Sequence, residues 1–361
     1  MKSPSIPLYK RGKIGGFRRG EGKGGGEKDK YHPHPTPLPS RERAKRIISQ
    51  NWQNQNKVKE VFMSSKNIEQ IKFIDIHTHA YRKECPLADG KTRFATPEEV
   101  IKRYDEIGIE KGAYLPLIGP EEYLPQSNED VIDICERSGG RLFPFCNLDP
   151  RGIQNSPDAD FSIWLQHYKD RGCKGIGEFM PNLPFEDPRC QNFFKHAEKV
   201  GLPLLFDIST RIGGTYGLYD DPGLPQLERT LKRFPCFVII GHGAAFWAEI
   251  GVLETPADRA TYPSYPVKEE GVVPKLLRRY KNLWADLSAG SGYNALARDV
   301  DYAVKFLEEF QDRLLFGTDI CRADQPLPLA EFLINLNKSG RLSNKAFKKI
   351  ARENAIKLLG L

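Results

Sequence analysis

Eight short apolar runs, each followed by a stretch with a helical pattern, constrain the fold of this chain more than any other feature. The runs are IKFIDI (71–76), KGAYLPL (111–117), RLFPFCNL (141–148), CKGIGEF (173–179), LPLLFDI (202–208), CFVIIGH (236–242), NLWADLS (282–288) and RLLFGTD (313–319). Strands that alternate with helices predict a parallel sheet. Eight of them predict an α/β fold, a (β/α)₈ TIM barrel. A doubly wound sheet is the second choice, but no Gly-rich nucleotide turn follows the first run.

The predicted helices have recognisable ends. Thr96-Pro97-Glu98-Glu99 is a capping box with proline at the first helical position, and Gly108 follows as a stop signal. Asp187-Pro188 begins another helix, which we expect to end at Gly201. Two further helices are predicted near 327–338 and 343–358.

The N-terminal part differs in composition from the rest of the chain. Residues 1–62 carry 15 Lys and Arg against 5 Asp and Glu, whereas the other 299 residues carry 39 against 42. Residues 1–65 are rich in Gly, Pro and charge, so we predict a disordered basic tail. Such an arm suits nucleic acid, but HPHPTPLPSRER resembles translated non-coding repeat DNA. We therefore favour a true start at Met63, and we expect the barrel domain to span 66–361.

Cysteine usage and hydropathy bear on location and partners. The seven cysteines are odd in number and form no CxxC pair, which is typical of reduced thiols in the cytosol. No apolar run approaches the ~20 residues of a transmembrane helix. We expect a cytoplasmic protein that acts on a small molecule and binds neither membrane nor nucleic acid. A homo-oligomer is compatible with the sequence, which leaves the oligomeric state open.

Ionisable residues stand at the ends of most predicted strands. The first run leads into FIDIHTH, in which alternation places Asp75, His77 and His79 on the same side. The residues in the same position on later runs are Glu178, Asp207, His242, Asp286 and Asp319. The C-terminal strand ends of a TIM barrel carry its chemistry, and buried charges are costly unless they are paired or bind metal. A divalent cation among these groups resolves the conflict.

This pattern resembles the amidohydrolase superfamily, and within it the amidohydrolase-related group of metal-dependent hydrolases and decarboxylases. The resemblance covers about residues 72–361. The segments that show the resemblance are FIDIHTH, GCKGIGEF, VIIGHG, ADLSAGSGYNALARD, RLLFGTD and NAIKLLGL. It implies that His77, His79 and Asp319 bind metal and that His242 orients or polarises the substrate.

Two strand ends depart from that pattern. Related sequences usually have histidine where this chain has Asp207, and the glutamate of GIGEF, Glu178, is similar to a metal-binding glutamate of TatD-type nucleases. The predicted ligands of one or two Zn²⁺ or Mn²⁺ ions are His77, His79, Glu178, Asp207 and Asp319. Asp286 either caps a turn or takes part in catalysis.

The predicted function is a metal-dependent hydrolase in which metal-activated water attacks an amide, lactone or ester-like carbon of a small molecule. Asp319 and His242 are the predicted catalytic residues. Arg211, Tyr216 and Trp247 are the predicted substrate contacts. The alternatives are a non-oxidative decarboxylase, a TatD-like phosphodiesterase or nuclease, and a non-catalytic binding module. The chain after residue 62 is weakly acidic, whereas nucleic-acid binding requires basic surface. The nuclease is therefore the less supported alternative.

Overall fold

The computed structural model describes residues 71–361. The predicted tail, Met63 and the predicted domain start at residue 66 lie outside the described residues, so those predictions stay open.

Eight parallel strands form the centre of residues 71–361, and each lies in or overlaps one of the eight apolar runs. They are β1 (Phe73–Asp75), β2 (Ile109–Tyr114), β3 (Leu142–Pro144), β4 (Ile176–Phe179), β5 (Leu204–Phe206), β8 (Ile239–Gly241), β9 (Leu283–Asp286) and β10 (Leu314–Leu315). Continuous pairing gives two sheets, ordered β1-β2-β3 and β10-β9-β8-β5-β4. Two more short strands, β6 (Ile208–Ser209) and β7 (Leu218–Tyr219), pair with each other after β5.

Backbone bonds join the two sheets into a closed barrel. Cys146 and Ile176 form a parallel bridge between the third and fourth strands. Thr78 and Ile320 form the corresponding bridge between the first and last strands, beside a bond in which the Ile76 amide donates to the Phe316 carbonyl at 3.1 Å. The sequence-based prediction of a (β/α)₈ barrel is confirmed.

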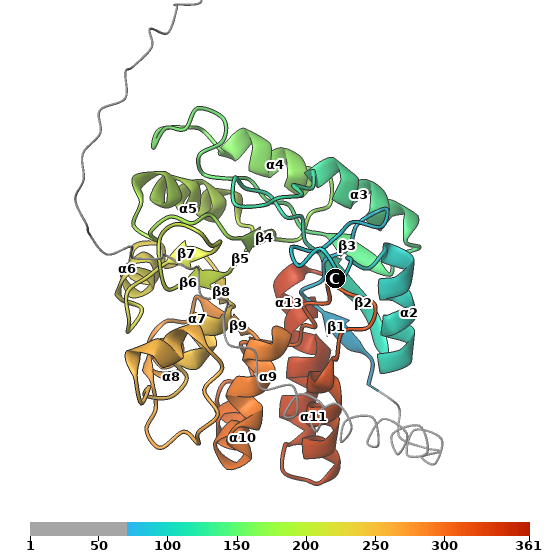
Figure 1. The fold of residues 1–361 in the computed structure, drawn as a ribbon, viewed down its shortest axis with the longest axis vertical. Helices are drawn as coiled ribbons and strands as arrows, with labels where there is room; N and C mark the ends of the chain where they lie inside the picture. Colours follow the sequence, from blue (N-terminus) through green and yellow to red (C-terminus); the bar gives the residue numbers. More distant parts are fainter. Residues whose placement is uncertain (1–70) are drawn as a thin grey trace, which may run out of the picture. The chain divides into compact units, whose positions relative to one another are not determined.

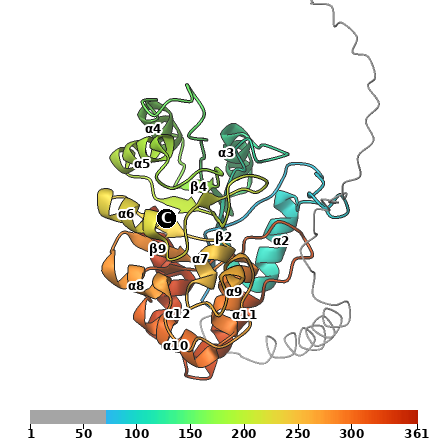
Figure 2. The same cartoon turned by 60° about the vertical axis from the view of Figure 1, so that its left-hand side comes forward.

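Helices surround these strands in two views of the molecule (Figure 1, Figure 2). The α-helices are α2 (Pro97–Ile107), α3 (Asn128–Arg137), α4 (Ser162–Asp170), α5 (Pro188–Val200), α6 (Pro225–Arg233), α7 (Ala244–Ala248), α8 (Val272–Arg279), α9 (Ala289–Ala297), α10 (Val300–Glu309), α11 (Pro328–Lys338), α12 (Asn344–Lys348) and α13 (Asn354–Leu359). A 3₁₀ turn, η1 (Pro256–Ala260), and a π-helical turn, η2 (Lys349–Glu353), complete the set. None of the helices over residues 71–361 is both long and apolar enough to cross a bilayer.

The helix ends follow the capping chemistry of the sequence. Thr96 and Glu99 form the predicted capping box at the start of α2, and Gly108 ends that helix in the left-handed conformation with φ 86°. Asp187 caps α5, which Gly201 ends with φ 76°. These ends fix the lengths of the helices that return the chain to the next strand.

The apolar core has an inner and an outer part. Inside the barrel, strand residues such as Ile74, Leu205 and Ile240 pack together, and Ala355 and Leu359 of α13 join the same cluster. The larger outer cluster fills the space between the strands and the surrounding helices. Because the inner cluster fills the barrel interior, polar side chains gather where the strands end.

Asp75 joins the first strand to the last. One oxygen, Oδ1, accepts the backbone amides of His77 and Thr318, each at 2.9 Å. The other, Oδ2, accepts the hydroxyls of Thr78 and Tyr104, each at 2.9 Å, and of Thr318 at 2.5 Å. Burial raises the pKa of this carboxyl to about 6.

The direction of Asp75 corrects one expectation from the sequence. The backbone bends at Ile76, so strict alternation stops there. The Asp75 carboxylate therefore faces Tyr104 of α2, whereas His77 and His79 turn toward the other polar strand ends. Gly112 permits this contact, since a Cβ there would lie 2.1 Å from the Tyr104 hydroxyl oxygen.

Replacing Tyr104 with phenylalanine tests the Asp75 contact. The substitution removes a buried hydroxyl donor to a carboxylate, and we expect the free energy of unfolding to fall by about 1 to 3 kcal/mol. Tyr219→Phe is the control, because its hydroxyl bonds the exposed carboxylate of Asp221 and its loss should cost no more than about 0.5 kcal/mol. Urea unfolding of both variants measures the difference; equal losses would contradict the assignment.

Candidate metal centre

Two imidazoles meet at the end of the first strand. The Nε2 atoms of His77 and His79 lie 2.9 Å apart. His77 Nδ1 lies 2.8 Å from a carboxylate oxygen of Asp286, and His79 Nδ1 lies 3.1 Å from the carbonyl oxygen of Leu115. Each of these oxygens is an acceptor, so each imidazole carries a proton on Nδ1, and Nε2 is the atom that it directs into the shared space.

Two carboxylates border the same space from other strands. Glu178 Oε2, from β4, lies 3.3 Å from His79 Nε2 and 3.6 Å from His77 Nε2. Asp319 Oδ1, after β10, lies 3.6 Å and 3.5 Å from the same two nitrogens. The histidine and glutamate side chains are at most 7% exposed, whereas that of Asp319 is 23% exposed. Asp319 is therefore the most solvent-accessible member of this group.

The chemistry of this donor set fits a divalent cation. Two Nε2 lone pairs at 2.9 Å repel each other unless a proton or a cation lies between them. Two carboxylates beside them add negative charge to a buried site, and a proton neutralises only one charge. Imidazole nitrogens and carboxylate oxygens are common ligands of Zn²⁺ and Mn²⁺. His77, His79, Glu178 and Asp319 would hold such an ion.

The charges within the cluster reinforce one another. Burial disfavours the charged form of His77, but the negative charge of Asp319 and the bond to Asp286 raise its pKa well above the usual value. Burial likewise opposes ionisation of Glu178, but its bonds to His77 and His79 hold its pKa well below the usual range. The carboxylate form required of a metal ligand is therefore favoured at this position.

Asp286, at the end of β9, orients two histidines through a single oxygen. Its Oδ2 lies 2.8 Å from His77 Nδ1 and 2.9 Å from His242 Nδ1, and it accepts the Ser288 hydroxyl at 2.6 Å. Its Oδ1 accepts the Ser288 amide at 2.9 Å, which is the turn cap that the sequence allowed. Despite burial, the hydrogen bonds from His242 and His77 hold the pKa of Asp286 well below its usual range.

These contacts place Asp286 behind the candidate metal centre, on the Nδ1 side of its histidines. His77, His242 and Asp286 also lie close enough together to suggest a second ion, but Asp286 Oδ2 faces the Nδ1 atoms at hydrogen-bond distance. A carboxylate that receives the Nδ1 proton fixes the tautomer and orientation of a ligating histidine. The sequence signal for Asp286 was its strand-end position, which did not distinguish this role from a turn cap.

His242 follows β8. Its Nδ1 contacts Asp286, and its Nε2 faces the cluster. Its Nε2 lies 3.8 Å from Glu178 Oε1 and 4.0 Å from Asp319 Oδ2. Burial and the neighbouring His77 oppose its positive charge, but the bond to Asp286 outweighs them, and the pKa of His242 rises to about 9. A raised pKa favours the imidazolium form, in which Nε2–H is directed at the cluster.

Asp207, after β5, lies beside the cluster. Its Oδ1 accepts the Ile208 amide at 2.5 Å, and no histidine nitrogen among residues 71–361 comes within 4 Å of its carboxylate. Burial and the negative charge of Glu178 raise the pKa of Asp207 to about 7. Gly243, with φ 97°, makes room for it, since a Cβ there would lie 2.0 Å from Asp207 Oδ1.

The three predicted substrate contacts occupy different surroundings. Tyr216 is half exposed, and the charge of Asp207 together with burial raises the pKa of its phenol, so the hydroxyl remains a donor at neutral pH. Arg211 is exposed in the same loop and donates to the Gly214 carbonyl. Trp247 is 1% exposed, and its indole N–H donates to the Asp286 carbonyl at 2.9 Å. Trp247 is therefore a core residue behind Asp286, and its indole ring is not accessible to a substrate.

Comparison with known proteins gives a family and a fold. Residues 74–361 match the family model described as amidohydrolase. A search of the curated proteins found no match to this chain.

Three solved structures have a similar fold. A probable 2-pyrone-4,6-dicarboxylic acid hydrolase from Acinetobacter baumannii is 15% identical, with a TM-score of 0.51 over 80% of this chain and 100% of that chain. An amidohydrolase from Burkholderia multivorans with bound zinc is 13% identical, with a TM-score of 0.53 over 80% and 99%. An uncharacterised TIM-barrel protein from Bordetella bronchiseptica is 16% identical, with a TM-score of 0.52 over 80% and 98%. At such identities the structures support the fold alone, whereas the match to the family model covers almost the whole barrel. This chain therefore belongs to the amidohydrolase family.

Proposed function

We propose that this protein is a metal-dependent hydrolase that cleaves an amide, lactone or ester-like bond of a small molecule. The observation that carries the proposal is the convergence of two Nε2 atoms, from His77 and His79, on a space bordered by two carboxylates. A divalent cation in this space would replace protons on the imidazoles and balance the charge of the carboxylates. A bound divalent cation supplies a Lewis acid, which polarises a substrate carbonyl and lowers the pKa of a water molecule.

Asp319 is the proposed general base. It is the cluster carboxylate that borders solvent, with 23% of its side chain exposed. Its Oδ1 faces the two imidazoles, and its Oδ2 lies 4.0 Å from His242 Nε2. A carboxylate in this position accepts a proton from the attacking water and passes it to the leaving group.

His242 is the proposed electrophilic residue. Asp286 holds its Nδ1 side, which leaves Nε2–H free to donate to the substrate oxygen on which negative charge develops. Tyr216, which stays protonated beside Asp207, offers a second donor near the opening. Hydrolysis is proposed over decarboxylation because a base at the solvent border suits the deprotonation of water.

Metal removal tests the centre. We expect protein purified without chelator to contain Zn²⁺ or Mn²⁺, and re-addition of either ion to chelated protein should raise the thermal unfolding temperature, because the ligand binds the folded state. His79→Ala should lose most of this increase. His167→Ala is the control, since that imidazole is 49% exposed on α4. An equal increase in both variants, measured by differential scanning fluorimetry, would place the ion elsewhere.

Asp207→Asn tests whether this carboxylate belongs to the centre. The substitution removes a negative charge beside Glu178, so we expect weaker metal binding and a smaller preference for Mn²⁺ over Zn²⁺. Asp207→His should retain the metal and favour Zn²⁺. Competition with a chelating dye gives both affinities. If Asp207→Asn has the metal content, preference and thermal shift of the wild type, the centre consists of His77, His79, Glu178 and Asp319 alone.

The reaction class is tested with a panel of lactones, esters and amides, alongside small aromatic and enoic acids assayed for CO₂ release. We expect hydrolysis that requires metal. Asp319→Asn should lower kcat by about 10²- to 10⁴-fold through loss of the base, in samples shown by elemental analysis to hold metal. CO₂ release without hydrolysis would establish decarboxylation instead, and full hydrolysis by metal-free protein would refute the proposal.

A further inference from the structure

Asp319 has a left-handed backbone conformation, with φ 52°. Residues other than glycine adopt this region infrequently and at a cost in free energy, although aspartate enters it more readily than most. Its amide donates to the His77 carbonyl at 2.8 Å, which fixes one side of the residue to the first strand. A strained residue keeps such a conformation only when its surroundings hold it there, so the other side of Asp319 needs a restraint as well.

Gln325 provides that second restraint. Its Nε2 donates to the Asp319 carbonyl at 2.7 Å, and its Oε1 accepts the Cys321 amide at 2.9 Å and the Arg322 amide at 3.4 Å. One side chain therefore closes the turn that follows Asp319. The other donor to the Asp319 carbonyl among the described residues is the Cys321 thiol at 3.7 Å, which is a weak one.

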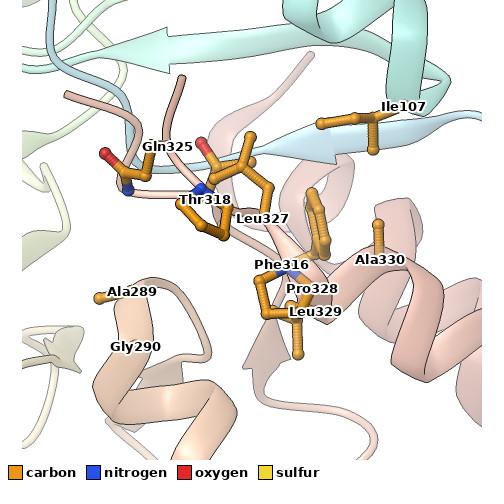
Figure 3. Close-up of a pocket in the computed structure, with 12 residues that line it drawn as sticks. Ile107, Ala289, Gly290, Phe316, Thr318, Gln325, Leu327, Pro328, Leu329 and Ala330 are labelled. Carbon is orange, nitrogen blue, oxygen red and sulfur yellow. The ribbon is translucent and has the colours of Figure 1, made fainter. Parts of the chain in front are cut away.

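The surroundings of Gln325 offer no ready substitute for this bond. Gln325 borders a cavity of about 320 Å³ whose other walls are mostly apolar (Figure 3). They come from the starts of α9 and α11, the end of α2 and the segment that follows β10. Thr318, the other polar side chain of the wall, is already bonded to Asp75. A water molecule that replaced the amide would find few polar partners in such a wall. The backbone carbonyl of Gln325 itself accepts Arg103 of α2 at 3.1 Å, which holds the residue in place.

We propose that Gln325 is a positioning residue of the metal centre, which holds Asp319 in its left-handed conformation so that the carboxylate faces His77 and His79. The inference rests on the proposed metal-binding function of that cluster. Without the amide bond, Asp319 can rotate about its N–Cα bond and leave the left-handed region. That rotation also turns the Cα–Cβ bond and moves the carboxylate away from the two Nε2 atoms, so metal binding weakens while the barrel remains folded.

Gln325→Met tests this role in the full-length protein, because methionine fills a similar volume without either hydrogen bond. Competition between the protein and a chelating dye for Zn²⁺ and for Mn²⁺ gives the affinity. We expect binding about 10- to 100-fold weaker than in the wild type, the usual effect of losing a group that orients a metal ligand. The unfolding temperature of the metal-free variant should change much less than its metal affinity does.

Leu329→Ala is the matched control. Leu329 is buried in the wall of the same cavity, so its truncation lowers stability without touching the Asp319 turn. We expect Leu329→Ala to bind metal as the wild type does. Equal losses of metal affinity in Leu329→Ala and Gln325→Met would show general destabilisation and overturn the inference.

Gln325→Glu provides a second variant if the methionine variant does not fold. It keeps the acceptor for the Cys321 amide but sets a carboxylate oxygen against the Asp319 carbonyl, so its metal affinity should fall at least as far. With a substrate found in the panel above, kcat should fall more than KM rises. Wild-type metal affinity in either folded variant overturns the role of Gln325 alone. A wild-type protein that binds neither ion overturns the metal-binding function itself, so the two failures are distinguishable.

Discussion

The backbone hydrogen bonds between the first strand and the last close the barrel, and the position of the polar cluster depends on them. The His77 carbonyl accepts the Asp319 amide at 2.8 Å, and the His79 amide donates to the Ile320 carbonyl at 2.9 Å. These bonds unite parts of the chain that lie more than 200 residues apart. They close the barrel, and they also set two imidazoles against the carboxylate of Asp319. The contacts that close the barrel are therefore also the contacts that assemble the candidate metal centre.

A cluster of buried charges at the strand ends is unfavourable for folding unless hydrogen bonds or ions compensate it. Here two carboxylates, Asp286 and Asp75, accept most of the hydrogen bonds. One oxygen of Asp286 accepts hydrogen bonds from the Nδ1–H groups of two histidines. Asp75 accepts five hydrogen bonds, from the first strand, from the last strand and from Tyr104 of α2. These two carboxylates satisfy the polar groups behind the centre. In front of them, the Nε2 atoms of His77 and His79 face each other and the carboxylates of Glu178 and Asp319, which is the arrangement expected of a site that binds a cation.

Much of the fold followed from local sequence signals. The eight apolar runs gave the positions of the eight strands, and the capping residues Thr96 and Asp187 gave the starts of two helices. The strand-end rule also brought out His77, His79 and Asp319 before any contact was known. These features were predictable because periodicity and capping depend on neighbours in the chain, and because a parallel barrel places all its strand ends on one side.

The roles of particular side chains were harder to predict. A bend at Ile76 turned Asp75 away from the histidines, and packing buried Trp247 in the core. Gln325 lies in a loop with no periodic pattern, so nothing in the sequence pointed to it. The sequence by itself determined which segments form the strands and which residues follow their ends, since strand period and the succession of runs along the chain are local properties. Only the tertiary structure decided which of them face one another, because the direction of a side chain depends on hydrogen bonds and packing between segments remote in the chain.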